Sequence, residues 1–253
     1  MKILLFALLV VAGMAAWQVA LASDSKQTSV SNFQTFALKI LSADGKQTIG
    51  STHFAVSSDP SYETIKGETI YLDGQRDNEE ERMRLVKGAP ELERYDHSFF
   101  DADGKTIMID KLDSQARIAS CARREDGAMN ERTSSFEVPS DTFAGGSQLL
   151  ILAMNLRAGR EKIVFHAFTC IPGPRIFPIE ASVPKVAERW PYYSGDLIRL
   201  DLKPDLGLGL NLMVAPFLPK TEAWFDPHDN WKYVGGEFDR YFRGPHVFQV
   251  LVR

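Results

Sequence analysis

The chain has 253 residues, of which 44% are hydrophobic and 25% charged, with a formal net charge of −4. This hydrophobic content is enough for a folded core. The length suits one large β-rich domain or two small ones, and one is favoured because no linker segment is found in the sequence. The mildly acidic balance, without a basic stripe, argues against a nucleic-acid partner.

The first segment is typical of a secretory signal peptide. Lys2 precedes the apolar run 3–13, and residues 20–22 form an A-x-A pattern before a polar stretch. The alternative is an uncleaved membrane anchor, but the small-residue site favours cleavage. We therefore expect a cleavable signal peptide over 1–22 and one β-rich domain over 23–253. That domain is expected to be exported, to the periplasm, and not to be transmembrane after processing.

Period-two alternation of apolar and polar residues predicts a series of β-strands along the mature chain. Asp-Gly pairs such as 44–45 and 103–104 mark hairpin turns. The expected strands are 36–40, 48–56, 62–71, 92–100, 106–112, 117–123, 131–138, 162–169, 175–183, 197–202, 206–214, 223–225 and 247–252. Many short strands separated by turn signals predict an antiparallel sheet or barrel. We interpret the charged run 79–82 as a solvated loop or edge.

One segment has helical periodicity instead. Ser147 is a capping residue, strong helix formers follow it, and Gly159 ends the pattern. Because the helix is apolar nearly all round, it should be largely buried, and the concave face of a curved sheet is the expected place. The predicted fold class is mainly β: a curved antiparallel sheet or half-closed β-barrel with one buried apolar helix at about 147–158.

The two cysteines remain after signal removal. Cys121 and Cys170 lack the C-x-x-C spacing of a redox or metal pair. Outside the cytoplasm a disulfide between two strands is the favoured interpretation. Against it, Cys121 alternates in phase with arginines and Cys170 with Val164 and Phe168, so the pairing stays open.

The order of features resembles a known family. A Val-Pro-Ser-Asp-Thr-Phe stretch (138–143) leads directly into the apolar helix, and a late Trp-Phe-Asp (224–226) precedes a terminal strand. This layout resembles a family of uncharacterised exported bacterial proteins, which are similar to the periplasmic lipoprotein carriers. The resemblance implies a half-closed antiparallel β-barrel with helices in its mouth and an envelope location. By fold analogy it also implies a lipid or lipoprotein as partner.

No motif commits the chain to catalysis. A serine hydrolase elbow needs G-x-S-x-G, and the stretch 145–147 lacks the second glycine, so Ser147 is better explained as a helix cap. Weak metal candidates are Asp226, His228 and Asp229, which are also ordinary turn residues. We predict no catalytic residue and no cofactor.

A surplus of apolar and aromatic residues is the positive signal. Candidate ligand-binding residues are Leu149, Leu152, Phe168, Trp190, Trp224 and Trp231, for which simple core packing is the alternative. The favoured function is non-catalytic binding of a lipid or other hydrophobic ligand in the concave face. The alternatives are a protein–protein interaction or structural module of the envelope, which would bind an envelope protein, and a hydrolase.

Overall fold

The computed structural model describes residues 32–170, 173–185, 189–205, 221–239 and 245–252. They belong to one compact unit, Ser31–Arg253. In these residues the chain forms fifteen strands of a single sheet and one helix. None of the helical residues described makes a segment long and apolar enough to cross a membrane. The predicted signal peptide, residues 1–22, lies outside the described residues.

The sheet consists of two arms that meet at the first and last strands. The N-terminal arm contains β1 (Asn32–Leu41), β2 (Thr48–Ser58), β3 (Tyr62–Tyr71), β4 (Arg76–Val86), β5 (Ala89–Phe100), β6 (Thr106–Asp113), β7 (Ile118–Glu125) and β8 (Ala128–Ser135). The C-terminal arm contains β9 (Thr142–Phe143), β10 (Lys162–Thr169), β11 (Arg175–Ser182), β12 (Ile198–Pro204), β13 (Thr221–Asp226), β14 (Lys232–Asp239) and β15 (His246–Leu251). Within each arm, strands that follow one another in sequence are neighbours, and β1 pairs with β15 to join the arms.

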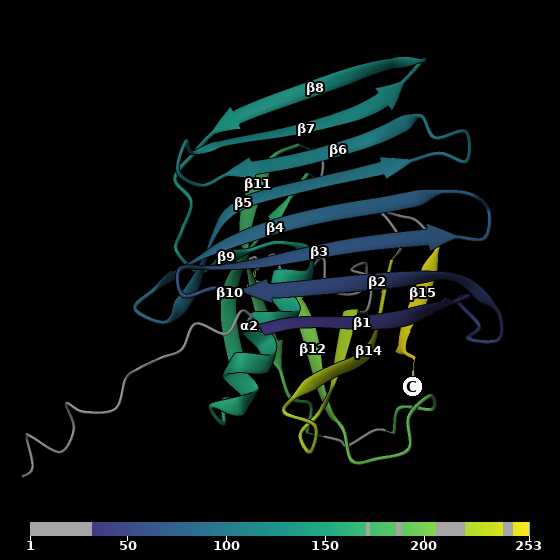
Figure 1. Cartoon of the computed structure of the whole chain (residues 1–253), viewed down its shortest axis with the longest axis vertical. Coiled ribbons are helices and arrows are strands. Elements are labelled where there is room, and N and C mark those ends of the chain that lie inside the picture. The colour runs from purple at the N-terminus through teal and green to yellow at the C-terminus, as the bar shows by residue number, and fades with distance from the viewer. Residues whose placement is uncertain (1–31, 171–172, 186–188, 206–220, 240–244, 253) are drawn as a thin grey trace, which may run out of the picture. The chain divides into compact units, whose positions relative to one another are not determined.

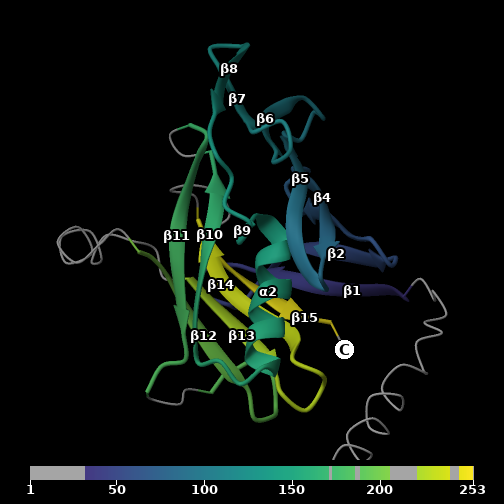
Figure 2. The same cartoon turned by 90° about the vertical axis from the view of Figure 1, so that its left-hand side faces the viewer.

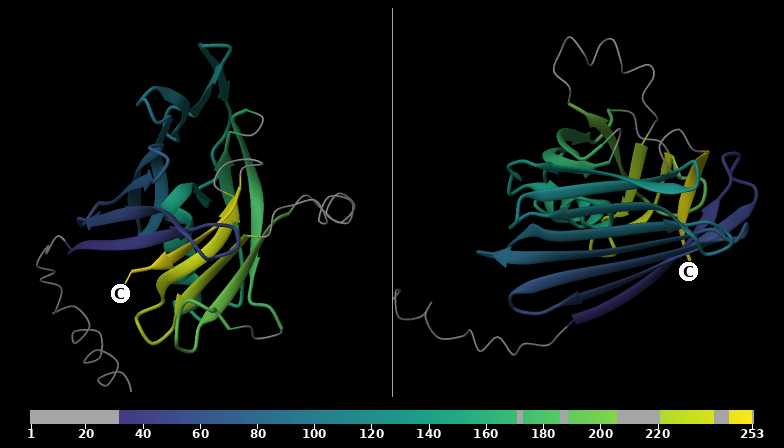
Figure 3. Two further views of the ribbon diagram at one scale, coloured as in Figure 1. Left: turned by 90° about the vertical axis from the view of Figure 1, so that its right-hand side faces the viewer. Right: turned by 90° about the horizontal axis from the view of Figure 1, so that it is seen from above.

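The helix α2 (Gly145–Arg157) lies between the two arms (Figures 1 and 2). It contacts β3 and β4 on one side and β10 and β14 on the other. Figure 3 shows the same arrangement from two further sides, with the strands of the two arms facing each other across the helix. Leu152 and Leu156 are buried by this packing, which is the expected outcome for a helix with apolar residues on several sides.

The main core fills the space around α2. It unites Leu38, Phe54 and Met83 of the N-terminal arm with Phe165 and Phe225 of the C-terminal arm. A separate cluster of Trp190, Trp224 and Val234 lies on the other face of the C-terminal arm. The strand β13 supplies both clusters, because alternate side chains of a strand point to opposite faces.

Cys121 on β7 and Cys170 after β10 form a disulfide bond, with their Cα atoms 5.6 Å apart. The bond links the far part of the N-terminal arm to the C-terminal arm. It therefore ties together two strands that are not neighbours in the sheet.

The fold class agrees with the expectation from the sequence: a curved, mostly antiparallel sheet holds one apolar helix, which begins two residues before the predicted start.

The interpretation of residues 79–82 as a solvated loop or edge is wrong, because β4 pairs with β3 and β5 along its length and Glu81 has no exposed surface. Strand β14 was not predicted, and the predicted strand 206–214 lies outside the described residues.

Candidate functional site

Two carboxylates from β4 hold the N-terminus of α2. Glu79 Oε1 accepts a hydrogen bond from the Gly146 N–H at 3.0 Å, and Glu81 accepts one from the Ser147 N–H at 3.0 Å to Oε1 and 3.1 Å to Oε2. The first N–H groups of a helix lack partners within the helix and carry partial positive charge, so carboxylates stabilise them. Gly145 permits this approach, because its φ is +42° and a Cβ there would lie 2.8 Å from Glu79 Cδ and 2.9 Å from Glu81 Oε1.

Ser147 closes the first turn of the helix from within. Its hydroxyl donates to the Ala144 carbonyl oxygen at 2.6 Å and accepts from the Ala144 N–H at 3.1 Å. Ser147 is thus the third residue of the helix, and Ala144 is the residue that precedes it. The prediction of Ser147 as the residue that caps the helix start is therefore wrong in position: the N-cap is Ala144, and Ser147 acts from the third helical position, with the two glutamates of β4 accepting from the helix N–H groups.

Burial makes the two glutamates unusual acids. Burial raises the pKa of Glu81 well above its ordinary value, and the neighbouring Glu79 raises it further. The pKa of Glu79 is also raised, first by burial and then by the charge of Asp77. Two adjacent carboxyl groups in a poorly solvated site resist being ionised together, so the charge of Glu79 favours the protonated form of Glu81.

A chain of ion pairs continues from β4 across β5 and β6. His97 Nε2 lies 2.9 Å from Asp77 Oδ1, and His97 Nδ1 lies 3.5 Å from Asp110 Oδ2. The Arg123 guanidinium binds both oxygens of Asp110. Burial opposes the charged imidazole, but hydrogen bonds to Asp110 and Asp77 outweigh it and raise the pKa of His97 to about 10. Asp77 and Asp110 are therefore compensated by His97 and Arg123.

A cavity of about 320 Å³ adjoins the N-terminus of α2 on the concave side of the sheet. Its polar lining includes Asp77 and Glu79, a Thr52–Thr69 hydroxyl pair at 2.8 Å, and Gln249, which accepts from the Tyr233 hydroxyl at 3.2 Å. Its apolar and aromatic lining comes from both arms and the helix: Phe54, Tyr71, Leu149, Leu202, Ala223 and Phe238. The cavity is thus lined by carboxylates from both arms, Asp77, Glu79 and Glu222, as well as by apolar and aromatic side chains.

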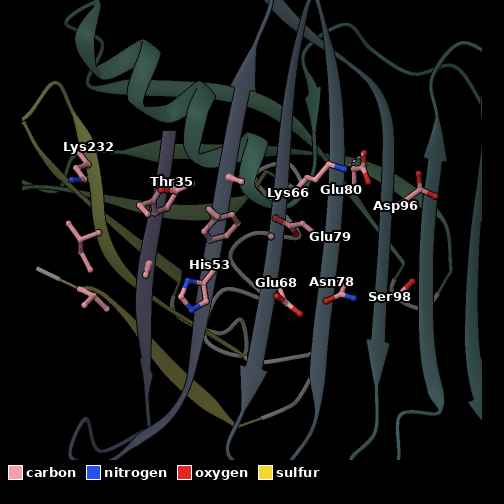
Figure 4. A pocket seen from close by; sticks show the side chains of 17 residues that line it. Thr35, His53, Lys66, Glu68, Asn78, Glu79, Glu80, Asp96, Ser98 and Lys232 are labelled. Carbon is pink, nitrogen blue, oxygen red and sulfur yellow. Dashed lines mark ion pairs between the residues drawn. The ribbon is translucent and has the colours of Figure 1, made fainter. Parts of the chain in front are cut away.

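A larger hollow of about 820 Å³ lies over strands β1 to β5 (Figure 4). Much of its lining is exposed and polar, including His53 and Glu68, and Lys66 forms an ion pair with Glu80 at 3.2 Å. Exposed polar side chains of this kind are ordinary for a solvated sheet face. Glu79 borders both hollows. Its half-buried carboxylate has a raised pKa and binds the Gly146 N–H of α2, which lines only the concave cavity of the two, so we take that cavity as the candidate site.

The six predicted ligand-binding residues lie in several places. Leu149 lines the concave cavity. Leu152 and Phe168 are buried in the main core. The rings of Phe168 and Tyr95 pack edge to face there, with their centroids 5.9 Å apart. Trp190 and Trp224 pack together in the separate cluster, with their ring centroids 5.1 Å apart.

The sixth, Trp231, is half-buried in the turn between β13 and β14. The structure therefore brings one of the six to the cavity, and it adds acidic and hydroxyl groups that the sequence analysis did not single out.

The predicted metal candidates form a turn. Asp226 accepts hydrogen bonds from the backbone N–H of His228 at 2.8 Å and of Asp229 at 3.3 Å, and from the Tyr193 hydroxyl at 2.5 Å. The Tyr193 hydrogen bond is the main cause that lowers the pKa of Asp226. In the part of the chain that the structure describes, the ligand atoms of these three residues form no close group.

Comparisons with known proteins bear on the fold. No protein-family model matches the chain, and no curated protein matches it. Among solved structures, the chain is similar to a β-barrel-like protein of the domain of unknown function DUF1849 from Brucella abortus, with a TM-score of 0.52 and 9% sequence identity. The match covers 89% of this chain and 98% of that one. The likeness shows a barrel-like β fold.

Proposed function

We propose that this protein is an exported, non-catalytic binding protein of the cell envelope, which holds a small ligand with an apolar body in its concave cavity. The observation that carries the proposal is the cavity itself, which the two arms and α2 enclose together. Small-molecule sites are usually concave, mostly apolar hollows with a few converging polar groups. The concave cavity has this composition.

The size of the cavity limits the ligand. About 320 Å³ lies at the low end of the roughly 300–1,000 Å³ typical of small-molecule sites. Around the helix, the remaining concave face is filled by the side chains of the main core. A short amphiphile or the end of an acyl chain suits this space better than a whole lipid.

Two features support the envelope location. The N-terminal sequence has the layout of a signal peptide, and disulfides such as Cys121–Cys170 persist mainly in oxidising compartments. The resemblance to lipoprotein carriers points the same way.

Native mass spectrometry of the mature protein purified from the periplasm, followed by solvent extraction, tests the proposal. A ligand in stoichiometric amount is expected in the wild type. Leu149→Trp should displace it, because Leu149 lines the cavity. Leu150→Trp is the matched control, since Leu150 packs against the main core on the same helix and is not among the cavity-lining residues. Equal ligand content in both variants would contradict the proposed site.

A further inference from the structure

The charges around the concave cavity differ in what they can offer a ligand. Asp77 faces the cavity but is paired with His97 at 2.9 Å. Glu222, another carboxylate of the lining, is paired with Arg199 at 3.3 Å. Both carboxylates therefore already have cationic partners.

Glu79 differs from these carboxylates and from its neighbour Glu81. Both Glu81 oxygens lie within hydrogen-bond distance of the Ser147 N–H, and Glu81 does not line the cavity. Glu79 lines the cavity, accepts a hydrogen bond from the Gly146 N–H at Oε1 and shares a side-chain hydrogen bond with Glu81. A carboxylate oxygen can accept more than one hydrogen bond, so Glu79 retains accepting capacity on the cavity side.

The rest of the lining suits a cation. Among the described residues that line the cavity, none is Lys or Arg, and four carry aromatic rings: Phe54, Tyr71, Tyr233 and Phe238. Aromatic faces attract ammonium groups, and a carboxylate in the lining repels an anionic ligand. The two glutamates already accept hydrogen bonds from the Gly146 and Ser147 N–H groups, so this pair of donors is occupied.

We propose that the concave cavity selects a small amphiphile bearing an ammonium group, which Glu79 binds while the apolar body rests against the aromatic and aliphatic lining. The inference rests on the proposed function, because it names the class of ligand for the same cavity. It assigns Glu79 as the residue that determines ligand charge.

Three molecules of matched size test the inference: hexylamine, 1-hexanol and hexanoate. Their affinities for the mature protein are measured by calorimetry near pH 8. Hexylamine is expected to bind about 10- to 100-fold more tightly than 1-hexanol, since a hydrogen bond to a charged partner is worth this much. Hexanoate is expected to bind most weakly.

Two variants of adjacent residues on β4 isolate the group responsible. Glu79→Gln should reduce the affinity for hexylamine to about that for 1-hexanol, because the amide carries no charge, and circular dichroism checks that the variant is folded. Glu80→Gln is the control, because Glu80 is exposed and paired with Lys66, and it should retain the wild-type preference.

The outcomes separate the inference from the proposed function. Equal binding of all three molecules to the wild type would overturn the charge selection and leave the cavity as a binding site. Loss of the amine preference in both variants, or in neither, would overturn the role of Glu79. Binding of none of the molecules would count against the proposed function itself.

Discussion

The substitution Gly145→Ala tests how closely β4 and α2 fit together. The backbone φ at Gly145 is +42°, and an L-residue in this left-handed region costs about 1–2 kcal/mol. The new Cβ would also lie 2.8 Å from Glu79 Cδ and 2.9 Å from Glu81 Oε1, so at least one carboxylate must move. Losing one hydrogen bond to a charged acceptor costs about 1.5–3 kcal/mol. The expected total loss in the free energy of unfolding is about 2.5–5 kcal/mol.

The other end of the same helix supplies the control. Gly159 has φ +75°, and a Cβ there would meet nothing within 4 Å. Gly159→Ala therefore carries the backbone cost of about 1–2 kcal/mol without any contact. The effect of either alanine on the unfolded chain is the same and cancels in the comparison.

Urea denaturation of both variants, with the disulfide intact, measures the two losses from the midpoint and the slope of the transition. We expect Gly145→Ala to be the more destabilising by about 1.5–3 kcal/mol. Equal losses would refute the reasoning, because they would mean that the carboxylates of β4 contribute nothing measurable to the helix start.

Other predictions concern the disulfide and two buried titratable side chains, His97 and Glu81. Replacing Cys121 and Cys170 together with Ser should lower the free energy of unfolding by about 4 kcal/mol in urea denaturation, since the bond closes a span of 49 residues; a loss below about 1 kcal/mol would contradict this. The pKa of His97 is raised from 6.5 to about 10. The stability that its ion pairs contribute is therefore fully present below pH 6.5 and is lost as the pH rises through about 10. An NMR titration of His97 with a midpoint near 6.5 would disprove the pairing. The folded-state pKa of Glu81 lies above 4.5, so the wild type should lose stability as the pH rises from 4.5 through that pKa, and Glu81→Gln should lose less; parallel pH profiles from urea denaturation would exclude this cause.

The sequence predicted most of the hairpins because alternation and Asp-Gly turns are local signals. The strand β4 was not predicted because its inward positions Asp77, Glu79 and Glu81 are acidic. Acidic residues at these positions indicate a solvated segment when only the sequence is considered. Their partners lie far away in the sequence: Gly146 and Ser147 are separated from the two glutamates by 67 and 66 residues. A pattern read along the chain cannot show that a helix N-terminus will stabilise these charges.

The candidate cavity was predictable in part for a related reason. Leu149 was identified because helical periodicity and an apolar helix in a β protein imply a buried position. The polar wall was missed because the Thr52–Thr69 pair lies within one hairpin and shows no distinctive pattern, and because Gln249 comes from the last strand, far away in the sequence. Strand β14 contains the pair Gly235-Gly236, which weakens the alternation that predicts a strand.

The pairing of β1 with β15 has a consequence for how the protein folds during synthesis. Each arm is a series of neighbours in sequence, which favours fast local folding. The junction between the arms pairs Leu38 with Leu251. The first strand to be synthesised therefore cannot complete its pairing until the last strand has been made. Until then β1 presents an unpaired edge, which is a hazard for association with other chains. A protein delivered across a membrane before folding would carry this exposed edge until its final residues arrive.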